Sequence, residues 1–153
     1  MLYENLTLER DGQIALVTLN RPEKLNAISR QLHLEMMEAC HELQNDDDVR
    51  AVIWTGAGRG FCSGVDLTAN RPSEESQTRQ EKLDEFHWVG RQAITISQTL
   101  EKPTIAAVNG VAAGAGMSLA LACDMRIGSE NTRFKTVFIE RNLSPDSGLS
   151  YFL

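Results

Sequence analysis

Short apolar runs alternate with amphipathic stretches along most of this chain. An apolar run covers residues 14–19, just after an Asp-Gly pair that favours a tight turn, and two more cover residues 51–55 and 104–108. Aliphatic runs of this length, bounded by turn residues, are typical of buried strands. The pattern therefore predicts a hairpin over residues 6–20 and buried strands at 51–55 and 104–108.

Between these runs, apolar residues recur at helical spacing. Ser29 is a favourable N-cap for a first helix that ends at Asn45 and an acidic run. The residues expected on its buried face are Leu32, Met36, Ala39 and Leu43. A second helix is expected before Pro103, with one face formed by Leu83, Phe86, Ala93 and Leu100. A third helix is expected through residues 119–122.

The remaining segments are shorter. Residues 68–80 are almost wholly polar and are expected to form a mobile loop, while short strands are expected near 125–127 and 134–137. A turn at 144–148 leads into the start of a helix. Strands alternating with helices indicate an α/β domain with mainly parallel pairing, and no internal repeat at a fixed period is evident. We expect one core domain over residues 1–153, incomplete at its C-terminus.

Composition narrows the class of protein. The chain has 153 residues, 42% of them hydrophobic and 24% charged, with a net charge of -6, which suits one globular domain and disfavours nucleic-acid or anionic-membrane partners. Three separated cysteines indicate neither a disulfide framework nor a zinc site. No signal peptide or membrane-spanning run is apparent, so the expected location is cytoplasmic.

Small residues follow two of the predicted strands and precede helices. Backbone amides at such helix starts can converge on an oxygen as an oxyanion hole, although tight strand–helix packing gives the same composition. No dinucleotide fingerprint or P-loop is present. Residues 60–64 have the outline of a nucleophile elbow built on Cys62, but no histidine is placed to serve it. His33 and His41 are expected on the exposed side of the first helix, and His87 is expected to be packed or exposed.

Three motifs carry a family resemblance. Residues 21–29 (RPEKLNAIS), 60–67 (GFCSGVDL) and 102–116 (KPTIAAVNGVAAGAG), in this order and separation, resemble the crotonase superfamily, also called the enoyl-CoA hydratase/isomerase family. The resemblance covers nearly the whole chain. It implies a spiral of ββα units, with the family's C-terminal helical portion missing, and acyl-CoA thioester substrates.

The resemblance also implies site residues. The thioester oxygen would accept hydrogen bonds from the backbone amides of Val65 and Ala115, which would stabilise an enolate-like oxyanion. Arg59 could add charge near the CoA phosphates. The residues implied to bind substrate and CoA are Lys24, Leu25, Ser63, Val65, Asp66, Leu67 and Gly114. No metal or separate cofactor is implied, since CoA is part of the substrate.

Departures from the family pattern bear on the reaction. The two glutamates used by the family's hydratases correspond to Ser118 and Phe138, neither of which can act as a general base. Asp146, however, stands where several isomerases of the superfamily carry an acid, and its surroundings are closest in motif to the phenylacetate-pathway ring-epoxide/oxepin-CoA isomerases. Asp146 would move a proton between carbons; its other interpretation is a turn residue before a helix. Glu140 has no matching role.

These observations favour double-bond or ring-epoxide isomerisation of an acyl-CoA through a thioester enolate. Hydration of an enoyl-CoA is the first alternative. A non-catalytic acyl-CoA-binding fragment or subunit is the second, and a thioester hydrolase using Cys62 is the third. Completed by a C-terminal portion, the protein is expected to form a homotrimer or hexamer. No nucleic acid or membrane is expected as a partner.

Overall fold

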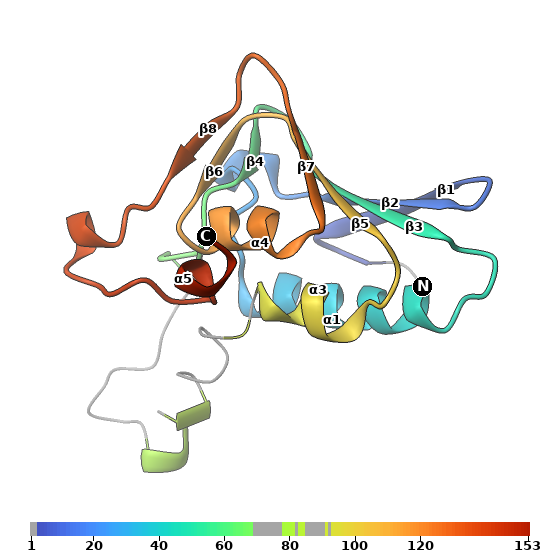
Figure 1. The fold of residues 1–153 in the computed structure, drawn as a ribbon. Helices are drawn as coiled ribbons and strands as arrows, with labels where there is room; N and C mark the ends of the chain where they lie inside the picture. Colours follow the sequence, from blue (N-terminus) through green and yellow to red (C-terminus); the bar gives the residue numbers. More distant parts are fainter. Residues whose placement is uncertain (1–2, 69–77, 82, 85–90, 92) are drawn as a thin grey trace.

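The computed structural model of the chain describes residues 3–68, 78–81, 83–84, 91 and 93–153. Along these residues the order strand–strand–helix repeats (Figure 1). The first unit is the hairpin β1 (Leu6–Asp11) and β2 (Ile14–Leu19), followed by α1 (Arg30–Gln44). A short 3-10 helix, η1 (Pro22–Lys24), connects the hairpin to α1.

Three further units continue the pattern. The second contains β3 (Ala51–Gly56), β4 (Gly60–Cys62) and α3 (Ile94–Thr99). The third contains β5 (Thr104–Val108), β6 (Val111–Ala113) and α4 (Ala115–Ala122). The fourth contains β7 (Met125–Gly128), β8 (Arg133–Lys135), the 3-10 helix η2 (Ile139–Arg141) and α5 (Leu149–Phe152).

Successive units add their strands to two separate sheets. One sheet has the order β1-β2-β3-β5-β7 and the other has the order β4-β6-β8. Only the β1–β2 pair is antiparallel among the described strands; every other pair is parallel. The first strand of units two to four therefore joins the large sheet and the second joins the small one. This arrangement confirms the expected α/β spiral of ββα units.

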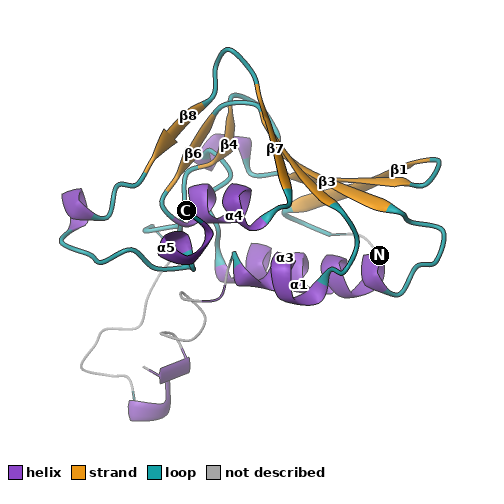
Figure 2. Ribbon diagram, in the orientation of Figure 1, coloured by secondary structure: helices purple, strands orange, loops and turns teal. Residues whose placement is uncertain are grey.

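The helices form two layers relative to these sheets. Helices α1 and α3 lie side by side below the five-stranded sheet, whereas α4 lies between the two sheets and contacts strands of both (Figures 1 and 2). The first turn of α1 is capped as expected, since the Ser29 hydroxyl oxygen accepts from the Leu32 amide at 3.1 Å. Leu32, Met36, Ala39 and Leu43 are buried, as their helical spacing predicts.

Several expectations about single elements are corrected. His33 is buried and not exposed, because α1 is covered by α3 as well as by the sheet. Leu83 is exposed and is not part of a buried helix face. Strand β8 ends at Lys135 and does not reach Val137, whose φ of 54° is incompatible with an extended strand. Strands β4 and β6, only three residues each, were not anticipated.

Two expectations fall largely on residues outside the description. Of the loop expected at 68–80, residues 69–77 lie outside the described residues, and Arg79 and Gln80 are helical. Phe86 and His87 also lie outside the described residues. No helix within the described ranges combines the length and hydrophobicity needed to cross a membrane.

Candidate active site

A cavity of about 180 Å³ lies where the ends of β4 and β6 meet the segment after β8. It brings together residues from three distant parts of the chain, including the three predicted to be catalytic: Val65, Ala115 and Asp146. The full lining is Ser63, Gly64, Val65, Leu67, Gly114, Ala115, Val137, Phe138, Glu140, Arg141, Leu143 and Asp146. Val65 and Asp146 are far apart in the sequence, and the spiral brings them together because it stacks successive units.

The orientation of the Val65 backbone amide is set by an isolated parallel bridge between Val65 and Ile28. The Ile28 amide donates to the Gly64 carbonyl at 2.7 Å, and the Asp66 amide donates to the Ile28 carbonyl at 3.0 Å. In a parallel bridge of this pattern, the residue between the two hydrogen-bonded positions points its own N–H away from the partner strand. The Val65 N–H is therefore not used in the bridge with Ile28.

The backbone amide of Ala115 is at the start of α4. The first N–H groups of a helix have no acceptor within the helix and carry the positive end of its dipole. The N-cap residue of α4, Gly114, adopts φ 51° and ψ -123°. Among the described residues, no side chain forms a capping hydrogen bond at this helix start. The Gly114 amide itself donates to the Lys135 carbonyl at 2.9 Å, which ties the helix start to β8.

The two amides are held near each other by direct backbone packing. A Cβ atom placed on Gly64 would lie 2.9 Å from the Ala113 carbonyl oxygen and 3.5 Å from the Ala115 nitrogen, and the φ of Gly64 is 99°. A Cβ atom on Gly116 would lie 2.1 Å from the Cys62 carbonyl oxygen. Only glycine fits at either position. The small-residue runs noted in the sequence are thus explained by close approach of β4 to the start of α4.

Two asparagines, the buried Asn26 and the half-buried Asn109, fix the glycine-rich loop that leads into β4. The Asn26 amide nitrogen donates to the carbonyls of Ala57 and Gly60, at 2.9 and 2.8 Å. The Asn109 amide nitrogen donates to the carbonyls of Gly56 and Gly58, both at 2.9 Å. These bonds replace the ladder hydrogen bonds that the loop lacks. They hold the backbone that precedes the Val65 amide.

Asp146 supplies a carboxyl group to the same cavity. It lies in the turn before α5, where its backbone carbonyl accepts from the Leu149 amide at 2.9 Å. Its Oδ1 atom is buried, with no hydrogen-bond partner among the described residues. Burial raises the pKa of the Asp146 carboxyl, against a hydrogen bond with Ser147 that lowers it. A raised pKa makes the carboxylate a stronger base, which favours its taking a proton from a bound substrate.

The other predicted binding residues divide into two groups. Ser63, Leu67 and Gly114 line the cavity together with Val65. Lys24, Leu25 and Asp66 are not part of its lining. Lys24 is exposed, and its Nζ donates to the Thr68 hydroxyl at 3.3 Å. Arg59 is exposed and also stands outside the lining.

Asp66 is buried in an ion pair. One of its carboxylate oxygens lies 2.9 Å from an Arg21 guanidinium nitrogen, and the other accepts from the Thr68 amide and hydroxyl. Burial opposes ionisation, but these hydrogen bonds outweigh it and lower the pKa of Asp66 to about 2. The side chain therefore braces the loop after β4, and only its neighbours Val65 and Leu67 face the cavity.

Four lining residues between β8 and Asp146 were not predicted as site residues: Val137, Glu140, Arg141 and Leu143. The chain reaches the cavity here through non-glycine residues in left-handed conformations, Val137 and Asn142, both at φ 54°. Such turns leave little trace in a sequence, apart from the known tolerance of asparagine for this region. Glu140 pairs with Lys135 at 2.8 Å.

The residues at the two glutamate positions cannot act as bases here. Phe138 is buried against the cavity, and Ser118 is fully buried with its hydroxyl 3.4 Å from the Gly114 carbonyl. Cys62 is also fully buried and not part of the lining, and burial raises the pKa of its thiol to about 12. A buried, protonated thiol is a poor nucleophile, so the geometry disfavours a hydrolase built on Cys62. The described residues contain no cluster of three metal-ligating side chains.

Comparison with known proteins agrees with this picture. The model of the family "Enoyl-CoA hydratase/isomerase" matches residues 9–153. A short-chain-enoyl-CoA hydratase of Clostridium acetobutylicum is 38% identical over 97% of this chain and 55% of its own length. A 1,2-epoxyphenylacetyl-CoA isomerase of Escherichia coli K12 is 37% identical over 92% of this chain and 53% of its own length.

The fold is shared with solved structures. An enoyl-CoA hydratase from Mycobacterium avium subsp. paratuberculosis K-10 superposes with a TM-score of 0.78 and 32% identity, covering 97% of this chain and 54% of that one. The chain therefore belongs to the enoyl-CoA hydratase/isomerase family and has the crotonase fold. It spans about half the length of the curated relatives it matches.

Proposed function

We propose that the protein isomerises an acyl-CoA, moving a double bond or opening a ring epoxide through a thioester enolate. The observation that carries this proposal is that Val65, Ala115 and Asp146 line one cavity. Two backbone donors with no acceptor among the described residues and one half-buried carboxyl are the groups that such a reaction needs. The protein would then act as an enzyme on an acyl-CoA partner, with no separate cofactor.

For double-bond migration, the proton balance is simple. The thioester oxygen accepts from the Val65 and Ala115 amides, which makes a carbon-bound proton acidic. The Asp146 carboxylate takes that proton, the electron pair moves into the enolate, and negative charge collects on the oxygen. The Asp146 carboxyl then returns the proton to a different carbon. Nothing is gained or lost overall, so no water or other reactant is consumed.

Hydration is the second candidate, favoured by the names of relatives such as the short-chain-enoyl-CoA hydratase of Clostridium acetobutylicum. Against it stand Ser118 and Phe138, which supply no carboxylate where the resemblance places the hydratase glutamates. An enolate formed beside a single acid is better suited to proton transfer between carbons. The epoxyphenylacetyl-CoA isomerase among the relatives supports the same preference.

Product mass separates the two reactions. The purified protein is incubated with a panel of enoyl-, dienoyl- and aryl-acetyl-CoA esters, the last including the ring epoxide, and the products are analysed by chromatography and mass spectrometry. Isomerisation gives a product of unchanged mass at a new retention time, whereas hydration adds the mass of one water. A product heavier by one water and no isomer would overturn the proposal. Binding of esters with no turnover of any would favour a non-catalytic acyl-CoA-binding protein.

A further inference from the structure

Arg141 presents a positive charge at the wall of the cavity. It is the last residue of η2, and its backbone amide donates to the Phe138 carbonyl at 2.9 Å. Its side chain is exposed and lines the cavity, and among the described residues no carboxylate lies within ion-pair distance of it. A guanidinium at a cavity wall that pairs with no carboxylate of the described residues is available to an anionic group of a ligand.

The other charged residues of the cavity leave this charge uncompensated. Glu140 is adjacent in sequence, but Lys135 holds both of its carboxylate oxygens, at 2.8 and 3.1 Å. Asp146 is the second acid, and among the described residues it forms no ion pair with Arg141. Of the described lining residues, Arg141 therefore offers a cation that can pair with a bound anion.

The size and composition of the cavity indicate which part of a CoA ester Arg141 meets. Its volume of about 180 Å³ is large enough for a short acyl group. Arg141 shares this wall with Val137, Phe138 and Leu143, which suit the methylenes of an acyl chain. The cations Lys24 and Arg59 lie outside the lining and remain available for phosphates.

We propose that Arg141 selects short acyl-CoA esters whose acyl group carries a second carboxylate. This inference rests on the proposed function, because it takes the acyl group to occupy the cavity next to Val65 and Ala115. The acyl carboxylate would accept hydrogen bonds from the guanidinium while the thioester oxygen accepts them from the backbone amides. The bound ester would thus be held at both ends of its acyl group.

Two saturated esters test this directly, because neither carries a double bond to react. Glutaryl-CoA and pentanoyl-CoA have five acyl carbons each and differ in having a carboxylate or a methyl group at the end. Calorimetry is expected to show glutaryl-CoA binding roughly tenfold more tightly, the lower end for a hydrogen bond to a charged group. Arg141→Gln is expected to abolish this difference while leaving pentanoyl-CoA affinity unchanged.

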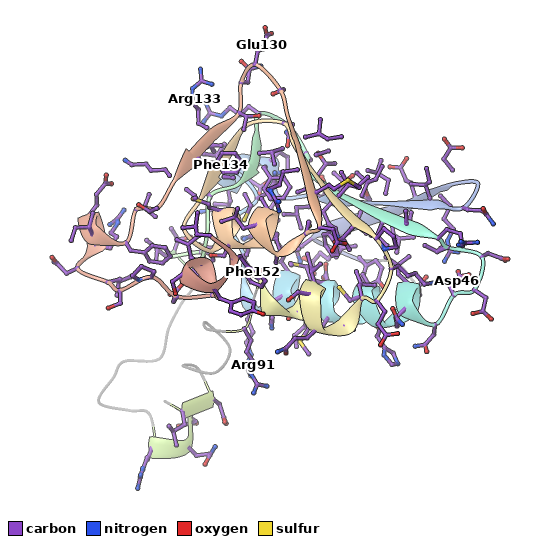
Figure 3. All side chains as sticks on the ribbon, viewed as in Figure 1. Asp46, Arg91, Glu130, Arg133, Phe134 and Phe152 are labelled. Atoms are coloured by element: carbon purple, nitrogen blue, oxygen red, sulfur yellow. The ribbon has the colours of Figure 1, made fainter. Side chains whose placement is uncertain are left out.

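Arg133→Gln is the matched control. Arg133 is an exposed arginine on β8 that bonds only to nearby carbonyls and is labelled well away from α5 in Figure 3. Its substitution is expected to keep the preference for glutaryl-CoA. Raising the salt concentration is expected to reduce the preference in the wild type.

Each contrary result has a distinct meaning. Equal affinity of the wild type for the two esters, or an unchanged preference in Arg141→Gln, would overturn the role of Arg141 while leaving acyl-CoA binding intact. An equal loss for both esters and for free CoA would place Arg141 at the CoA phosphates and would also overturn the inference. Failure of the wild type to bind either ester would overturn the role of Arg141, and only failure to turn over every ester of the panel as well would overturn the proposed function.

Discussion

Replacing Asp146 by asparagine tests the proposed base with almost no change in shape. The substitution removes the carboxylate that would take the substrate proton, and a positioned general base contributes about 10²- to 10⁴-fold in rate. That range corresponds to about 3 to 5 kcal/mol in the activation barrier. Turnover of the ester identified in the panel is expected to fall by this factor, with ester affinity changed by less than about threefold, because the backbone amides remain.

The same substitution has a predicted effect on stability. Burial raises the pKa of Asp146 in the folded state above its unfolded value of 3.8, so the unfolded state holds fewer protons as pH rises above that value, and folding is disfavoured. At pH 7 Asp146→Asn is therefore expected to raise the melting temperature. At pH 3 the gain is expected to vanish, because both states are then protonated.

Scanning calorimetry at the two pH values and a chromatographic turnover assay provide the measurements. Glu140→Gln is the matched control, since Glu140 is the other acid of the cavity and is held by Lys135; it is expected to retain most of the turnover. Turnover of Asp146→Asn within twofold of the wild type would refute the assignment of the base. A melting temperature lowered at pH 7 would refute the argument from burial.

Three more predictions concern the surroundings of the site. Gly64→Ala is expected to abolish ester binding and to destabilise the fold by about 1–3 kcal/mol, because the added Cβ would lie 2.9 Å from the Ala113 carbonyl oxygen. The control is Gly12→Ala, since Gly12 also has a positive φ but has open space around it. Calorimetry compares the two variants. Since the pKa of Asp66 is lowered to about 2, the contribution of its carboxylate to folding stability is complete above about pH 4 and is lost as the pH falls toward 2. Asp66→Asn is therefore expected to reduce the loss of stability between about pH 4 and pH 2, measured as acid denaturation followed by circular dichroism. Iodoacetamide at pH 7 is expected to leave Cys62 unmodified by mass spectrometry and turnover unchanged; rapid labelling with loss of turnover would revive the thiol hydrolase.

The elements with a strong local signal were predictable from the sequence. The Ser29 cap, the Asp-Gly hairpin and the apolar strands β2, β3 and β5 each follow from residues that are adjacent along the chain. Strands β4 and β6 are only three residues long, and they are defined by pairing with distant partners: β4 pairs with β6 about 50 residues along the chain, and β6 pairs with β8 about 22 residues along. No local sequence pattern predicts such strands. The prediction that His33 is exposed was wrong for a related reason, because the width of the buried face of a helix depends on which elements cover that helix.

The site was predictable to the extent that it is carried by motifs. Val65, Ala115 and Asp146 stand at motif positions and line one cavity. Glu140 and Arg141 line it as well, but their placement depends on left-handed turns at Val137 and Asn142, which no motif marks. Asp66, whose motif position implies a contact with substrate or CoA, forms an ion pair with Arg21 and lies outside the cavity lining.

Because of the tight backbone packing at Gly64 and Gly116, the position of the two amides and the shape of the opposite cavity wall can change independently during evolution. The spacing of the Val65 and Ala115 amides is set by main-chain contacts of residues 62–64 with residues 113–116, so side-chain changes elsewhere do not disturb it. The opposite wall, from Val137 to Leu143, is built from side chains on irregular backbone. Under the proposed function, substitutions in that wall alone would change which acyl group fits, while the two amides that would bind the thioester oxygen keep their positions.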